Sequence, residues 1–191
     1  MKIETLAVIG LVFLLGCGVG DEAPRAADSG AAVENDTEPA ILERPFTAEH
    51  IRDEWTEGLE IRIRELTEQG ESFQTWKVVR SDPEGVEIEA VATNAAGEPV
   101  GEASVQRSGW VELRDHATFS AEVASREFVH RDTPLGKLDG WLYTVGSEGS
   151  GPVSEFFFAE SLPGAPIWVR FSHDGEVVSS FEQIGRSKPT G

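Results

Sequence analysis

Four histidines are the residues best suited to acid–base or metal chemistry in this sequence of 191 residues. They are His50, His116, His130 and His173. No two of them have the H-x-H or H-E-x-x-H spacing that would hold a zinc ion. The sequence also lacks a phosphate-binding loop and a dinucleotide-binding fingerprint. We therefore expect no metal site and no bound cofactor.

One local cluster could form a hydrolytic triad. His116 follows Asp115, His130 lies near Asp132, and Ser120 stands between the two pairs. A triad is defined by geometry, however, and these residue types occur by chance in most chains of this length. No G-x-S-x-G elbow presents a serine nucleophile. We expect no catalytic residues and no enzymatic activity, with a hydrolase that uses His116 or His130 as the alternative.

Cys17 is the only cysteine, and the residues before it predict export. Lys2 gives a short positive start, although Glu4 weakens it, and residues 6–15 form an apolar run. This is the layout of a secretory signal. A membrane-spanning helix would need about 20 apolar residues, but the uncharged stretch ends at Asp21 and is rich in glycine. An internal disulfide is excluded because no second cysteine is present.

Residues 14–17, Leu-Leu-Gly-Cys, resemble the lipobox of bacterial lipoproteins. The resemblance implies cleavage after Gly16, a diacylglyceryl thioether on Cys17 and an acyl chain on the new amino group. Two or three acyl chains hold a protein on a membrane far longer than one chain does. Gly18 replaces the Asp that retains many such proteins in the inner membrane, which implies the outer membrane, facing the periplasm. The alternative is a signal peptide that contains a cysteine by chance and is cut elsewhere.

Composition divides the chain into a signal peptide (1–16), the lipidated cysteine with a tether (17–40) and one folded domain (41–187). The tether has no hydrophobic periodicity and few large apolar residues, so it cannot bury enough surface to fold. About twenty such residues reach roughly 25 Å on average. The 34 Asp and Glu against 16 Lys and Arg give a net charge of −18, which repels nucleic acid and anionic lipid head groups.

The domain shows two short helical patterns and nine strand patterns. A helix is expected near 47–55, with Thr47 as its cap and Ile51 and Trp55 on its apolar stripe, and a second over 108–119. Alternating residues and turn signals predict the strands. They cover residues 59–64, 73–80, 86–93, 100–106, 126–131, 138–145, 153–159, 167–171 and 176–182. No strand is followed by a long crossover helix, so we expect an α+β fold with a curved, mainly antiparallel sheet and two covering helices.

The second half of the domain carries most of the aromatic side chains. Phe156, Phe157 and Phe158 are consecutive, and neighbours in a strand point to opposite faces, so both faces of this strand must be apolar. The second face could meet the other half of a folded-over sheet, which we favour because aromatic residues serve packing more often than capture. It could also border a ligand. The possible apolar binding face comprises Trp141, Tyr143, Phe157 and Trp168.

Residues 133–143 (TPLGKLDGWLY) and 156–167 (FFFAESLPGAPI) resemble a pattern of uncharacterised exported bacterial proteins. The domain is also similar to the curved half-barrels of periplasmic lipoprotein carriers and related lipid-binding lipoproteins. The resemblance brings no catalytic residues with it. We therefore expect a lipid-anchored envelope protein that binds a lipid, a lipoprotein or another protein. The alternatives are an envelope hydrolase and a passive structural lipoprotein, and the sequence leaves the oligomeric state open.

Overall fold

The computed structural model describes residues 40–146 and 151–188. The expected cleavage site at Gly16, the lipidation site at Cys17 and the tether up to residue 39 lie outside these residues. In the described part of the chain, no helix has both the length and the apolar character needed to cross a membrane.

Two helices and nine strands make up the domain, which confirms the predicted fold class. In chain order they are α1 (Ala48–Glu54), β1 (Glu60–Thr67), β2 (Gly70–Asp82), β3 (Gly85–Thr93), β4 (Ser104–Gly109), α2 (Trp110–Asp115), β5 (Ala124–Thr133), β6 (Gly136–Val145), β7 (Pro152–Ala159), β8 (Trp168–His173) and β9 (Glu176–Ser187). The turn between β8 and β9 is a tight one, with positive φ at Asp174 and Gly175, as the Asp-Gly signal predicts.

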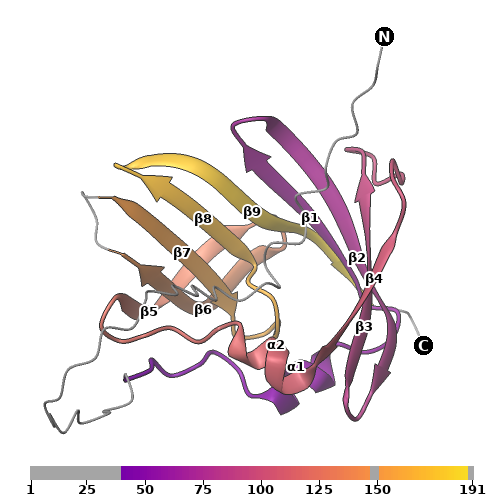
Figure 1. The fold of residues 1–191 in the computed structure, drawn as a ribbon, viewed down its shortest axis with the longest axis horizontal. Helices are drawn as coiled ribbons and strands as arrows, with labels where there is room; N and C mark the ends of the chain where they lie inside the picture. The colour runs from indigo at the N-terminus through magenta and orange to yellow at the C-terminus, as the bar shows by residue number, and fades with distance from the viewer. Residues whose placement is uncertain (1–39, 147–150, 189–191) are drawn as a thin grey trace, which may run out of the picture.

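Pairing between β1 and β9 joins two antiparallel meanders into one sheet. The strand order is β4-β3-β2-β1-β9-β8-β7-β6-β5, and every pair in it is antiparallel. The sheet curves, and α1 and α2 lie at one end between its two halves (Figure 1). Within residues 40–146 and 151–188 the end strands β4 and β5 do not pair with each other. The sheet is therefore open.

The first helix forms as expected and the second is shorter than expected. Thr47 accepts a hydrogen bond from the backbone N–H of His50 at 3.1 Å and so caps α1. The expected helix over 108–119 is reduced to Trp110–Asp115. Ser108 instead pairs with Val86 at the end of β4, which lies later in the chain than the predicted strand over 100–106. The backbone N–H of Val100 donates a hydrogen bond to the carbonyl of Ala92. Val100 therefore lies in the turn after β3, and the predicted strand does not begin at residue 100.

The face of the sheet toward the helices, here called the inner face, carries the main core. The helices contribute Ile51, Trp55 and Trp110, and alternate strand residues such as Ile61 and Ile63 pack against them. The buried members are Phe46, Ile51, Trp55, Leu59, Ile61, Ile63, Val78, Val86, Ile88, Trp110, Ala117, Tyr143, Phe158, Val169 and Phe181. Burial of these alternate positions fixes the register of each strand.

A second, smaller core lies on the opposite, outer face of the sheet. Its buried members are Leu142, Phe157, Ala159 and Ile167, with Val129, Leu135, Leu138, Leu162 and Trp168 packed around them. All of these belong to residues 129–168. We expected the other half of a folded-over sheet to cover the second face of β7. The structure does not show this arrangement on the outer face. Apolar side chains from β5, β6 and β8 and from the β5–β6 and β7–β8 connections cover this face instead.

Candidate functional site: the open part of the inner face

The residues of the possible triad are not brought together. The imidazole Nδ1 of His130 lies 2.6 Å from Asp139 Oδ1 on the neighbouring strand β6, whereas Asp132 lies 3.9 Å from the ammonium of Lys137. The side chains of His130 and Asp139 are 78% and 60% exposed. Because both side chains are largely in water, the protein does not hold them in a fixed position for proton transfer to or from a substrate.

The other triad candidates have different neighbours. Asp115 forms ion pairs with Arg44 at 3.3 Å and Arg114 at 2.7 Å. The hydroxyl of Ser120 accepts a hydrogen bond from the backbone N–H of Glu122 at 3.3 Å, and the side chain of His116 is exposed. Within the described ranges, no group of three or more His, Cys, Asp or Glu side chains could hold a metal ion.

The four residues of the predicted apolar binding face are divided between the two faces of the sheet. Trp141 and Tyr143 lie with the inner-face core, and Phe157 and Trp168 lie with the outer-face cluster. Phe157 pairs with Trp168 across β7 and β8. Tyr143 and Phe157 are fully buried. These four side chains therefore do not form one continuous surface.

Tyr143 is buried under two segments that cross the inner face of β6 and β7. Its hydroxyl donates a hydrogen bond to the backbone carbonyl of Glu43 at 2.5 Å, and the Phe119 ring stacks on it with centroids 4.7 Å apart. Burial raises the pKa of Tyr143 to about 12, because the charged form loses its solvation. This part of the inner face is closed.

An arginine covers each of the two tryptophans of the predicted binding face, Trp141 and Trp168. The guanidinium of Arg126 lies 3.4 Å from the ring centroid of Trp141 and forms an ion pair with Glu43 at 2.5 Å. On the outer face, the guanidinium of Arg131 lies 4.3 Å from the ring of Trp168. Cation–π contacts of this kind favour a fixed side-chain position. Both arginines belong to β5, the strand at one end of the sheet.

The part of the inner face away from the helices remains partly exposed. We call Glu65, Trp76 and Phe171, with the buried Gln74 between Glu65 and Trp76, the open inner face. Phe156 borders it, beneath the Phe119 ring at 5.1 Å. Trp76, Phe156 and Phe171 are partly buried around the main core. The ring of Trp76 lies 5.9 Å from that of Phe181, and the rings of Phe156 and Phe171 are 6.2 Å apart. Partly exposed aromatic rings are common at binding surfaces, where they bury a large area on contact.

A hydrogen-bonded chain crosses this open inner face. The indole Nε1 of Trp76 donates to Gln74 Oε1 at 2.8 Å, and Gln74 Nε2 donates to Glu65 Oε1 at 2.8 Å. Burial raises the pKa of Glu65, although hydrogen bonds from Gln74 and Ser72 oppose the shift. A carboxylate that has lost part of its solvation favours a partner that supplies a hydrogen-bond donor or a positive charge.

The alternation of β1 carries a sequence signal for Glu65. In β1, alternation places Ile61 and Ile63 on the inner face, and the next residue of the same parity is Glu65. A charged residue at a position predicted to face a core is unusual. It marks the point where the inner face stops being filled by the helices.

A groove of about 620 Å³ lies elsewhere, on the outer face beside residues 96–99. Its charged lining is mixed, and Lys77 is already paired with Glu60 at 3.6 Å. The backbone carbonyl of Ala95 accepts a hydrogen bond from Arg62 in the same region. Because these charges largely compensate each other, the groove is less suited than the open inner face to select a partner.

Comparison with known proteins shows similarity of fold. The sequence matches no family model, and no curated protein matches it. A MucB structure in complex with MucA(peri) has a TM-score of 0.52 and 10% identity, covering 75% of this chain and 55% of that chain. A structure of MucB gives 0.51 and 10% identity over 73% and 57%, and a MucA/MucB complex of Pseudomonas aeruginosa gives 0.49 and 10% over 74% and 56%. The chain thus spans little more than half the length of these MucB chains, and it shares with MucB the fold of a curved sheet.

Proposed function

We propose that this protein is a non-enzymatic binding module of the bacterial cell envelope that holds a partner on its open inner face. The observation that carries the proposal is the hydrogen-bonded chain that links the partly exposed Trp76 ring through Gln74 to the partly desolvated Glu65 carboxylate. An aromatic surface with one polar group is the usual composition of a recognition site. The fold shared with MucB, which has been solved in complex with MucA(peri), supports a protein-binding role.

The charge of the chain favours a protein partner over an anionic lipid. The net charge of −18 repels anionic lipid head groups. Glu65 would pair with a donor or a basic side chain, and the rings of Trp76 and Phe171 would cover apolar side chains. We therefore favour a protein segment that combines apolar and basic residues, with a lipid or a lipoprotein as the other outcomes of the test.

We further propose that the module is attached to the outer membrane through acyl chains on Cys17. Residues 14–17 carry this proposal by their resemblance to a lipobox. A tether of about twenty residues after the cysteine, as its composition predicts, would let the domain reach a partner roughly 25 Å from the anchor point. The same attachment would raise the effective concentration of the module toward partners in the same membrane.

Photo-crosslinking in cells tests the site. A benzoylphenylalanine in place of Trp76, in the full-length protein, is expected to give a covalent adduct with the partner. The matched control places it at Phe73, on the outer face of the same strand β2. Mass spectrometry of the adduct distinguishes a protein from a lipid. Equal adduct yields from both positions, or none from position 76 in folded protein, would contradict the proposed site.

A further inference from the structure

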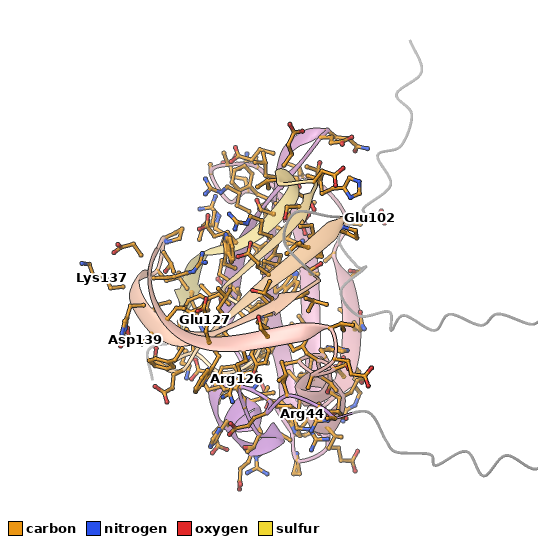
Figure 2. The ribbon with its side chains drawn as sticks, turned by 90° about the vertical axis from the view of Figure 1, so that its left-hand side faces the viewer. Arg44, Glu102, Arg126, Glu127, Lys137 and Asp139 are labelled. Atoms are coloured by element: carbon orange, nitrogen blue, oxygen red, sulfur yellow. The ribbon has the colours of Figure 1, made fainter. Side chains whose placement is uncertain are left out.

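The free edge of β5 has an unusual charge sequence. β5 pairs with β6 over ten residues without a break in register, and in the described part of the chain no strand pairs with its other edge. Figure 2 views the molecule from this side, with Arg126 and Glu127 of β5 labelled. An unpaired edge presents backbone donors and acceptors to any other strand. Proteins usually protect such an edge with charged side chains, proline or a bulge. β5 contains no proline and no bulge, and its charges are of both signs, at Arg126, Glu127, Arg131 and Asp132.

We propose that β5 pairs with β5 of a second copy of this chain, antiparallel and centred on Val129. In this register Glu127 faces Arg131 of the partner subunit, and Arg126 faces Asp132 of the partner subunit. The two-fold symmetry repeats both contacts. The pairs between Glu127 and Arg131 of the partner subunit carry the complementarity, because the Arg126 side chain is 13% exposed and already forms an ion pair with Glu43 of its own chain. Opposite charges directly across two strands stabilise the pairing.

Other registers lose this complementarity. A two-fold antiparallel pair along one edge must be centred on a residue, because residues opposite each other point to the same side of the sheet. The neighbouring registers are therefore centred on Phe128 and on His130. A register centred on Phe128 puts Glu127 opposite Val129 of the partner subunit, and one centred on His130 puts Glu127 opposite Thr133 of the partner subunit. Of these registers, only the one centred on Val129 sets Glu127 opposite Arg131 of the partner subunit, and opposite charges directly across two strands stabilise the pairing.

The side chains needed for this pairing are already held in place. Arg126 is stacked on Trp141 and Arg131 on Trp168, so less side-chain freedom is lost on association. Phe128 is 45% exposed, with its ring 5.0 Å from that of Trp141. In the proposed register Phe128 faces His130 of the partner subunit, and the contact would cover part of the exposed ring.

The pairing also preserves the faces of the sheet. Residues that lie opposite each other in an antiparallel pair point to the same side. Arg126 and Phe128 are on the face of Trp141 and Tyr143, so the inner faces of the two subunits would lie on the same side of one continuous sheet. Two open inner faces would then be available to one extended partner.

Disulfide trapping in the full-length protein tests the register. The Cα atoms of opposite residues in an antiparallel pair are about 4.5 to 5.5 Å apart, within the range for a disulfide. The variant Val129→Cys is therefore expected to form a disulfide-linked dimer under mild oxidation. The matched control is Ser125→Cys on the same strand and face, which would lie about 27 Å from its symmetry mate. The unmodified chain controls for Cys17.

A charge exchange tests the complementarity. In the Val129→Cys background, Glu127→Arg is expected to reduce the dimer yield about tenfold, because like charges would then face each other twice. Adding Arg131→Glu reverses both signs and is expected to restore the yield. A Val129→Cys yield no higher than that of Ser125→Cys would overturn the proposal, as would an adduct with another protein in place of the dimer. The melting temperature of the charge-exchanged variant shows whether it is folded. If that temperature equals that of Val129→Cys alone and the dimer yield is still not restored, the proposal is also overturned.

Discussion

The indole Nε1 of Trp55 donates a hydrogen bond of 2.9 Å to the backbone carbonyl of Pro163. Trp55 follows the last residue of α1 and is 2% exposed, and Pro163 belongs to the connection between β7 and β8. The bond therefore attaches the first helix to the second meander, across 108 positions of sequence. The contact holds the helices at one end of the sheet and leaves the rest of the inner face open.

Replacement of Gly164 is expected to break this attachment. Gly164 has φ +121°, and a Cβ atom there would lie 2.1 Å from Trp55 Nε1. We expect Gly164→Ala to lower the free energy of unfolding by about 3 kcal/mol or more, from backbone strain and overpacking together. Gly175→Ala is the control, because Gly175 also has positive φ but no atom within 4 Å of the added Cβ. It should cost about 1 kcal/mol. Urea unfolding measures both, and equal losses would contradict a special role of the Trp55 contact.

Tyr143 is the only tyrosine in the chain, so its ionisation can be followed directly by tyrosinate absorbance near 295 nm. Because burial raises its pKa to about 12 in the folded protein, the midpoint should fall near that value and return to about 10 on unfolding. The folded state then binds more protons than the unfolded state between these two values. Stability should therefore decrease as the pH rises from about 10 to about 12.

The variant Tyr143→Phe separates the hydroxyl from the ring. It removes the hydrogen bond to the carbonyl of Glu43 and is expected to cost about 1 to 2 kcal/mol at neutral pH. It should also lack the part of the alkaline loss of stability that arises from Tyr143. A native midpoint near 10 in the titration of the unmodified chain would show that the hydroxyl is solvated.

Glu65→Gln tests the desolvated carboxylate of the open inner face. The pKa of Glu65 is raised above 4.5 by burial, so the folded state binds more protons just above that pH and its stability falls as the pH rises through this window. The variant has no titrating carboxyl group at position 65, so it does not lose stability in this pH window. Its amide oxygen can still accept the hydrogen bond from Gln74. We expect a higher melting temperature than that of the unmodified chain at pH 7 and a smaller difference at pH 4. Glu68→Gln, in the exposed turn between β1 and β2, should change neither value.

Mass spectrometry of the mature amino terminus tests the proposed anchor. We expect a protein that begins at Cys17 and carries the mass of a diacylglyceryl group, with or without a further acyl chain. Cys17→Ser should prevent lipidation and release the domain from the membrane fraction, while the folded domain keeps its melting temperature. A mature protein that starts elsewhere, or an unmodified Cys17, would contradict the lipoprotein assignment.

The sequence by itself determined the local elements and the antiparallel class of the sheet. Alternation in β1, the Thr47 cap of α1 and the Asp174-Gly175 turn depend on neighbouring residues only, and all three occur as predicted. The boundaries were less accurate where a distant contact replaced the local pattern. Ser108 was predicted to be helical but belongs to β4, because it pairs with Val86.

Only the tertiary structure decided which side chains meet. Pairing of Ile63 with Gln183 and of His130 with Asp139 follows from strand order and register, which depend on packing across the whole sheet. Consecutive aromatic residues in β7 are apolar on both faces, so alternation alone could not assign Phe157 to the outer face or Tyr143 to the inner one. Within residues 40–146 and 151–188, the inner face stays partly open because two helices fill only one end of the sheet, and the edge of β5 is free because β4 and β5 do not pair.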